Sequence, residues 1–490
     1  MKHFIKKSVA VLLAAAVFCF AAGCAGGGEK APQTYAEAYT EPVTLRVVTE
    51  KGTNKSGSYS QDKWTLEAIR KMADTFTKEH PTVTFEFELL PADKDAREPV
   101  LQRIRTEIMA GKGPDLYLLP STTNNPNPEL QAYYNSDSFD NFYLESLFVD
   151  VNQAMHSGKF FDISPYYDGD TALDKDGLNQ SVMDGGCVES ARYVLPIKYT
   201  VPIVYGYVPA LEKAGLSIDA LSTTTETYFS TLAAHGDSAF CPGLQSTFFS
   251  AFSQLYDYEK EQVAVNLDSM VSFLKAYQDY ELYANGTLPP MELLHHSSQD
   301  VSAVSEEAPM IADELNETTL QMVVNAKLRG DEMAMIPLNT SDGTLAAKVT
   351  YWSAVGAACQ HPQEAYDFLT QFLSSEFQDG ESHQGGMDLG AYQSWPVRTN
   401  GLISTIWDNY RNIYAMTEEA KEIDLTDEDF PILQAEIGSV RFETGWEDDL
   451  NMLMINRMLD WDGMDRQPSA ESLEDIAQDI LDELRWRIQE

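Results

Sequence analysis

Residues 43–120 alternate between strand-like and helix-like patterns, and this alternation restricts the chain to few folds. The strand-like runs are 43–48, 82–89 and 114–120, the last mostly apolar as buried parallel strands are. Apolar residues at helical spacing lie between them, from Leu66 to Phe76 and from Leu101 to Ile108. Strands joined by helices form parallel sheets through right-handed crossovers. The sequence therefore predicts an α/β fold with a mainly parallel sheet flanked by helices.

Similar patterns recur further along the chain. Two apolar strand-like runs meet across a polar turn within 193–207, and a short helix follows at 210–215. Further strands are expected at 331–339 and 348–359, and an amphipathic helix at 469–490. The sequence has 490 residues, which makes two domains the expectation.

The N-terminus has the pattern of an export signal. Lys2, Lys6 and Lys7 precede an apolar run at 9–22 that is too short to span a bilayer comfortably. The run Ala21-Ala22-Gly23-Cys24 resembles the lipobox of bacterial lipoproteins, with Ala where Leu is more usual. We expect 1–23 to be removed, Cys24 to be lipidated, and 24–42 to be a tether to the outer face of the cytoplasmic membrane. Ordinary secretory cleavage, which would release a free protein, is the alternative.

Charge and cysteine content exclude several function classes. The chain has 76 acidic against 34 basic residues and a formal net charge of −42, which disfavours binding to nucleic acid or to anionic lipid. Besides Cys24, three cysteines remain beyond the signal, namely Cys187, Cys241 and Cys359, without a Cys-x-x-Cys spacing. The pair His295-His296 is a weak metal signal in a polar loop. We therefore expect neither a metal nor a cofactor.

Polar side chains follow the first and third strands. Residues 50–54 and 120–124 would lie at the carboxyl ends of these strands, where open α/β sheets bind ligands. Their hydrogen-bonding side chains suit a polyhydroxylated ligand, although Gly, Asn and Ser also simply form turns.

Four segments carry a resemblance to a known family. They are Gly111-Lys112-Gly113-Pro114-Asp115, then 193–216, then 352–373, and Trp395-Pro396-Val397-Arg398. In this order the chain resembles family 1 extracellular solute-binding proteins, the maltose-binding-protein-like group. It departs from the family at Tyr205-Gly206-Tyr207, where Tyr-Tyr-Asn is frequent, and after 308–314, where an aromatic residue is missing. Residues 225–310 match poorly.

The resemblance implies a periplasmic-binding-protein-like fold with two α/β lobes, each a mainly parallel sheet flanked by helices, which close on a ligand in the cleft between them. We expect residues 43–197 and 338–397 in the N-terminal lobe, and 200–336 and 400–490 in the C-terminal lobe. The crossings would lie near 198–199, 337–338 and 398–399. The implied function is capture of a mono- or oligosaccharide by a monomer that delivers it to the permease of an ABC importer.

The expected ligand-binding residues combine polar groups with aromatic rings, because a sugar ring presents apolar patches bordered by hydroxyls. Core packing is the alternative for each aromatic residue. The P-loop, His-Glu-x-x-His and Gly-x-Ser-x-Gly motifs are absent from the sequence, so we expect no enzyme. A secreted carbohydrate hydrolase and a sensing or adhesion module stay open as alternatives. The candidates are Glu50, Lys51, Asn54, Thr122, Asn124, Lys198, Tyr199, Tyr205, Tyr207, Asp313, Glu314, Trp352 and Trp395.

Overall fold

A computed structural model divides the chain into Met1–Glu37 and Ala38–Glu490. All described residues belong to the second unit, so the predicted signal peptide and Cys24 lie outside them, as do Asn54, Cys241 and His295-His296. The described ranges are 38–51, 61–124, 143–236, 251–283, 310–315, 318–378, 394–399, 402–413, 417–462 and 465–488.

The larger sheet has seven strands in the order β15-β8-β14-β3-β1-β2, and β16 also pairs with β14. Its first three strands are parallel to one another, as the alternating pattern predicts. β2 lies at one end of the sheet, which explains why apolar and polar residues alternate along it. The strands are β1 (Val43–Glu50), β2 (Val83–Leu90), β3 (Leu116–Pro120), β8 (Val194–Thr200), β14 (Leu345–Val355), β15 (Trp395–Pro396) and β16 (Ile437–Phe442).

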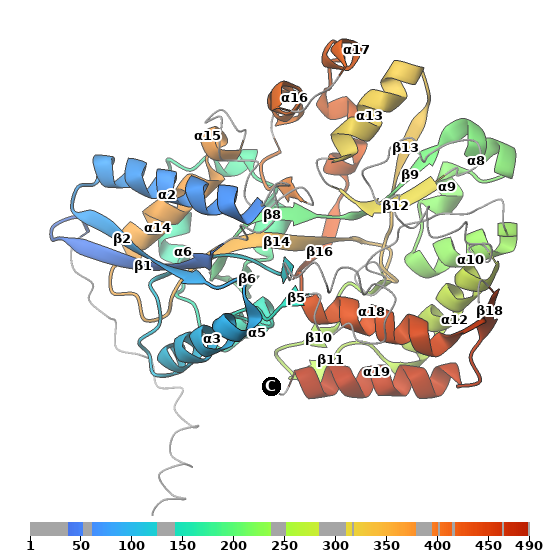
Figure 1. The fold of residues 1–490 in the computed structure, drawn as a ribbon, viewed down its shortest axis with the longest axis horizontal. Coiled ribbons are helices and arrows are strands. Elements are labelled where there is room, and N and C mark those ends of the chain that lie inside the picture. The colour runs from blue at the N-terminus through green and yellow to red at the C-terminus, as the bar shows by residue number, and fades with distance from the viewer. Residues whose placement is uncertain are drawn as a thin grey trace, which may run out of the picture. The chain divides into compact units, whose positions relative to one another are not determined.

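Two helices cover opposite faces of the first strands. β1 lies between β2 and β3, so the two crossovers run in opposite directions along the sheet. Right-handed crossovers then place α2 (Gln61–Glu79) on one face and α3 (Lys94–Met109) on the other, as Figure 1 shows. The Asp93 side chain accepts a hydrogen bond from Ala96 N at the start of α3. Gly111, at φ 67°, directs the chain away after the helix.

A second sheet has three strands and is antiparallel throughout the described residues. β9 (Pro202–Tyr207) pairs with β12 (Met310–Glu314) on one side and β13 (Met333–Pro337) on the other. The α/β fold class is confirmed, but the expectation of a mainly parallel sheet in the second lobe is wrong for these three strands. β9 follows β8 after the single residue Val201, and Lys198 and Tyr199 lie within β8 instead of in a turn.

The buried apolar residues form two clusters. The larger one contains the core of the seven-stranded sheet and buried residues of 403–442. The smaller one contains Val204 and Ile336 of the second sheet and the apolar faces of α10 (Thr225–His235), α12 (Leu267–Tyr283), α18 (Gly445–Met458) and α19 (Leu473–Arg487). The predicted C-terminal segment 400–490 therefore contributes to both clusters. The exact extents of the two proposed lobes stay a prediction.

The remaining helices and strands are mostly short. They are β4 (Thr123–Asn124), β5 (Tyr143–Leu144), α5 (Val151–His156), α6 (Ser164–Gly169), α7 (Gln180–Asp184), β6 (Cys187–Val188), β7 (Ala191–Arg192), α8 (Val208–Ala214), α9 (Ile218–Leu221), β10 (Tyr256–Asp257), β11 (Gln262–Val263), α13 (Thr318–Arg329), α14 (Pro362–Thr370), α15 (Ser375–Gln378), α16 (Leu402–Ile413), α17 (Glu418–Lys421), β17 (Leu459–Asp462) and β18 (Asp465–Pro468).

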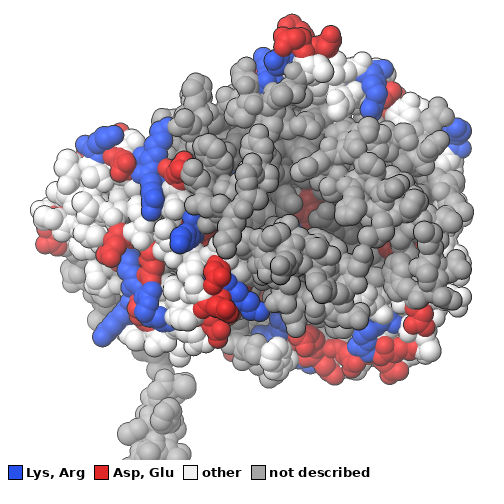
Figure 2. Space-filling view, viewed as in Figure 1, with Lys and Arg blue, Asp and Glu red and all other residues white. Residues whose placement is uncertain are grey.

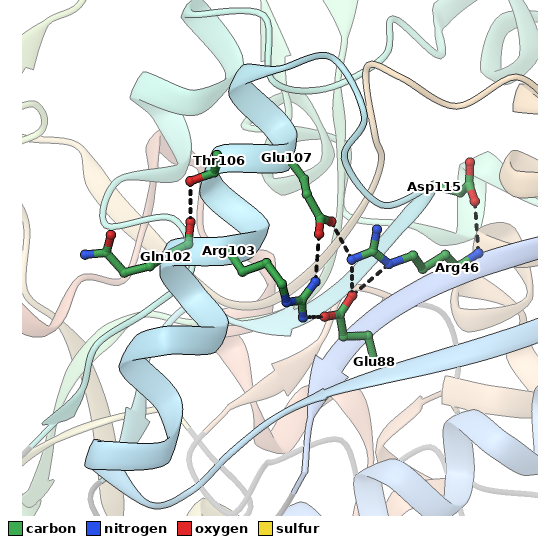
Figure 3. Close-up of polar contacts among 7 residues, drawn as sticks. All are labelled: Arg46, Glu88, Gln102, Arg103, Thr106, Glu107 and Asp115. Carbon is green, nitrogen blue, oxygen red and sulfur yellow. Dashed lines mark hydrogen bonds and ion pairs between the residues drawn. The ribbon is translucent and has the colours of Figure 1, made fainter.

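A ring of four charges fixes α3 against β1 and β2 (Figure 3). Arg46 Nε donates to Glu88 Oε2 at 2.7 Å, and Arg46 Nη2 lies 2.6 Å from Glu107 Oε2. Arg103 contacts both carboxylates and lies 2.8 Å from Glu107 Oε1. Partial burial raises the pKa of Glu107, but the hydrogen bonds from the two arginines outweigh it and leave the pKa lowered. The two arginines therefore favour the charged form of Glu107.

The connection between the two sheets contains an acid-sensitive turn. Slight burial raises the pKa of Asp342, but hydrogen bonds from Thr340, Thr344 and Ser253 lower it to about 2. A carboxylate with a lowered pKa stabilises the fold above its ordinary pKa and loses this contribution as the pH falls. We therefore expect the stability difference between wild type and Asp342→Asn to be constant above pH of about 4 and to shrink towards pH of about 2. Denaturant unfolding across this range measures it, and a pH-independent difference would contradict it.

Candidate ligand-binding crevice

Side chains from both sheets meet in a junction cluster, which consists of Thr122, Glu314, Lys348 and Glu443. Thr122 follows β3 and donates from Oγ1 to Glu443 Oε2 at 2.9 Å. Lys348 Nζ of β14 lies 3.2 Å from Glu443 Oε1 and 2.5 Å from Oε1 of Glu314, the last residue of β12. The larger sheet and the three-stranded sheet are thus joined by one buried ammonium.

The junction cluster has more negative than positive charge. Burial is the largest cause that raises the pKa of Glu314, and Glu443 raises it further, while Lys348 lowers it. Lys348 is buried between the two carboxylates, which offsets the cost of removing its charge from water. Loss of either partner would leave a charge of the cluster without its counterion.

A crevice of about 450 Å³ adjoins β16 and the start of α18. This volume is within the range of small-molecule pockets, which is roughly 300–1,000 Å³. The crevice lies between elements of the two hydrophobic clusters, because α5 and α7 belong to the larger one and Tyr256 and Trp446 to the smaller one. It is lined by Asp150, Asn152, His156, Ser181, Asp184, Gly185, Cys187, Gln254, Leu255, Tyr256, Tyr258, Ile437, Gly438, Ser439, Val440, Arg441, Phe442, Thr444, Trp446 and Glu447.

Asp150 holds one wall of the crevice in place. One of its oxygens accepts from Gln153 N at 3.0 Å and caps α5, and the other accepts from Tyr258 OH at 2.7 Å. Tyr258 also stacks on His156, with ring centroids 5.3 Å apart. Burial raises the pKa of Asp150, against the effect of these hydrogen bonds. The contact joins α5 to the segment around β10, which lies on the opposite side of the crevice.

The second wall combines aromatic rings with a buried ion pair. The rings of Tyr256 and Trp446 lie 5.9 Å apart, and the Arg487 guanidinium lies 5.5 Å from the Trp446 ring. Arg441 Nη2 is 3.2 Å from Glu447 Oε2, and both side chains are buried. Burial is the main cause that raises the pKa of Glu447, while Arg441 and Lys348 oppose it.

Close packing brings α7 against β16. A Cβ atom at Gly185 would lie 2.4 Å from Val440 Cγ1, so only glycine permits this approach. Gly185 thereby places Asp184 and Cys187 beside the strand that lines the crevice. Aromatic faces, carboxylates, two amides and hydroxyls converge here, and this combination can hold a polyhydroxylated molecule.

None of the predicted ligand-binding residues lines the crevice, although two of them belong to the adjoining junction cluster, namely Thr122 and Glu314. Glu50 is buried, and both its oxygens accept from Arg97 at 2.7 Å. The pair ties the end of β1 to α3. Lys51 is exposed after β1. Asn124 and Asp313 are described only by their backbones, which pair with Tyr143 and Ile203.

The predicted aromatic residues mostly lie in the core. Trp352 is only 1% exposed and packs against Phe148, Phe160 and Phe442. The other buried candidates are Lys198 and Tyr199 in β8, Tyr205 in β9 and Trp395 in β15. Burial raises the pKa of Tyr199 to about 12. The Tyr205 hydroxyl lies 2.5 Å from Thr319 Oγ1, and the Trp395 ring stacks on Phe430. Tyr207 is half-buried just before α8.

Sequence reasoning missed β16 and the residues that follow it. The run 437–447 contains an aromatic residue next to acidic residues at the start of a helix, and that combination was the available signal. Trp446 also belongs to the smaller hydrophobic cluster.

Comparisons with known proteins give the fold. A periplasmic oligogalacturonide-binding protein from Yersinia enterocolitica is 15% identical, with 91% of this chain and 99% of that chain covered and a TM-score of 0.53. A family 1 extracellular solute-binding protein from Alicyclobacillus acidocaldarius is 14% identical, with 92% and 99% covered and a TM-score of 0.51. The chain has the fold of extracellular solute-binding proteins. No protein-family model and no curated protein matches the sequence.

The same fold also occurs in a designed enzyme. A structure described as a de novo designed cysteine esterase is 13% identical, with 91% of this chain and 98% of that chain covered and a TM-score of 0.52. Identities this low establish the arrangement of strands and helices but carry no residue roles. Among the described residues, no helix is both long and apolar enough to cross a membrane, and no group of His, Cys, Asp and Glu could hold a metal ion.

We expect Arg97→Met to lower the free energy of unfolding by about 3–5 kcal/mol, because it leaves Glu50 as a buried charge without its partner. The double variant Arg97→Met/Glu50→Leu should recover much of this loss, since it removes both charges. Denaturant unfolding of both variants tests this. Equal losses in the single and double variants would contradict the pairing.

Trp352→Ala should lower the free energy of unfolding by about 3–5 kcal/mol, because it opens a cavity among three phenylalanine rings. Trp486→Ala is the matched control, since that side chain is 53% exposed, and its effect should stay below about 1 kcal/mol. Similar losses in the two variants would contradict the core assignment of Trp352.

Proposed function

We propose that this protein is the substrate-binding component of an ABC importer and captures a mono- or oligosaccharide. The observation that carries the proposal is the crevice between the two hydrophobic clusters, with aromatic rings and hydrogen-bonding side chains along it, in a chain with this fold. The fold relative from Yersinia enterocolitica, which binds oligogalacturonide, supports a carbohydrate as the ligand class.

The proposal includes a place outside the cytoplasm. The N-terminal pattern of a signal peptide and Cys24 supports export and lipid anchoring. Delivery to membrane-embedded permease subunits then follows from the role of a substrate-binding component. Two lobes would close on the ligand by a hinge motion at the connections between the sheets, near Val201 and 338–344.

The environment of the crevice favours binding of the ligand without chemical conversion. Cys187, His156 and Asp184 all line it, and a designed cysteine esterase shares the fold. Burial is the largest cause that raises the pKa of the Cys187 thiol; neighbouring carboxylates raise it further, while Arg192 lowers it. A reactive cysteine needs the thiolate, which this environment disfavours.

We expect isothermal titration calorimetry with a panel of mono- and oligosaccharides to give saturable binding of at least one member. The ligand should be recovered intact by chromatography after prolonged incubation. Cys187→Ser should still bind the same ligand and leave it intact, because no nucleophile takes part. Cleaved oligosaccharide would favour the hydrolase alternative, and hydrolysis of a nitrophenyl ester that depends on Cys187 would favour an esterase.

A further inference from the structure

We propose that a latch made by Tyr258 and Ile488 holds α5 and keeps the crevice closed before a ligand arrives. This inference rests on the proposed function and concerns the regulation of its site. The latch consists of three contacts: Tyr258 with Asp150, Tyr258 with His156, and Ile488 with Gln153. Entry and release of a ligand would then both require the latch to open.

The helix α5 is fixed to one wall of the crevice. Val151, Ala154 and Met155 are buried in the larger hydrophobic cluster. Asp150 accepts a hydrogen bond from Gln153 N at 3.0 Å, which caps the helix. Because of this packing, α5 has to move with the larger cluster when the walls of the crevice separate.

The two latch residues are fixed to the smaller hydrophobic cluster. Tyr258 and Ile488 both pack against it, and the ring of Tyr258 lies 5.7 Å from that of Tyr256. Ile488 directly follows α19, whose apolar side chains lie in the same cluster. Acidic side chains gather along the edge where α19 lies, so the helix turns its charged face to solvent (Figure 2). The latch therefore spans the boundary between the two clusters.

Each contact of the latch joins segments that are far apart in the chain. Tyr258 OH donates to Asp150 Oδ2 at 2.7 Å over 108 positions, and its ring stacks on that of His156. Gln153 Nε2 donates to Ile488 O at 3.2 Å over 335 positions. The C-terminal end of α19 accordingly lies on the side of α5 in Figure 1.

These contacts have to break when the crevice opens. Asp150, His156 and Tyr258 all line the crevice, so two of the three contacts join its walls directly. The chain connections near Val201 and 338–344, in contrast, persist during a hinge motion. Since the latch forms between groups of the protein alone, it favours the closed form without a ligand and limits the fraction of open molecules.

Kinetic measurements can detect the latch, because a closed crevice exchanges its ligand only through the open form. Tyr258→Phe removes the hydrogen bond to Asp150, and Gln153→Met removes the bond to Ile488, with little change in side-chain volume. We expect each variant to raise both the association and the dissociation rate constant about threefold or more, and the double variant to raise them further. The affinity should change less than either rate constant.

Two methods measure these effects on the full chain. Stopped-flow tryptophan fluorescence gives the rate constants, since Trp446 lines the crevice, and its probes are cellotriose, maltotriose and a galacturonate trisaccharide. Small-angle X-ray scattering needs no saccharide. Without a ligand, the double variant should have a larger radius of gyration than the wild type, and it should contract when a bound saccharide is added.

Two matched controls remove the same kinds of contact within the larger cluster. Tyr366 OH donates to Asp170 Oδ2 at 3.0 Å, and Gln363 Nε2 donates to Asp367 Oδ1 at 2.7 Å. These bonds lie in α14 or between α14 and the end of α6, and both helices pack in that cluster. Tyr366→Phe and Gln363→Met should therefore leave the rate constants and the radius of gyration unchanged.

The outcomes separate the latch from the receptor function. Unchanged rate constants and an unchanged radius of gyration in both latch variants would overturn the latch but leave the receptor function standing. Faster dissociation with an unchanged association rate would also overturn it, because a residue that only contacts the ligand acts mainly on dissociation. Absence of binding to every saccharide would overturn the receptor function, and scattering alone would then decide whether the latch exists.

Discussion

The pairing of β14 with three other strands is the constraint on which the rest of the structure depends. Tyr351–Val355 lie between β3 and β8, and Leu345–Val349 pair with β16. The strand is buried along nearly its whole length, so it is fixed by packing on both faces as well as by hydrogen bonds. One continuous strand thereby sets the register between the first strands of the sheet and a segment near residue 440.

This register determines where charge can be buried. Lys348 is on the part of β14 that pairs with β16, and it therefore lies near Glu443, which directly follows that strand. Glu443 N also donates to Val349 O at 3.0 Å, which fixes the backbone that carries the carboxylate. Because a buried ammonium needs partners at short range, a shift of the register by one residue would turn Lys348 to the other face and leave it without them.

The elements from 43 to 120 could be predicted from the sequence because their signals are local. The strand with Phe85 and Phe87 begins and ends within one residue of its expected bounds, and the helix with Leu66 and Phe76 appears where it was predicted but extends further, over Gln61–Glu79. The site could not be predicted in this way, because its residues meet only through long-range pairing. Trp352 shows the difficulty. A strand that is buried on both faces has no alternation of apolar and polar residues, so the sequence does not distinguish side chains in the core from side chains in a cleft. Glu50 shows it too, since its partner Arg97 is 47 positions away on another element.

Two carboxylates that line the crevice, those of Asp150 and Glu447, are buried, and their burial lowers the stability of the charged forms. Asp150 and Glu447 would be more stable as charges in water, and burial raises the pKa of both. Each is retained with a specific partner on or across the crevice, Tyr258 for the first and Arg441 for the second. Neutral side chains would avoid the desolvation cost and hold the same volume. The crevice therefore retains two carboxylates whose charged forms burial disfavours, and each keeps a specific partner that offsets part of this cost.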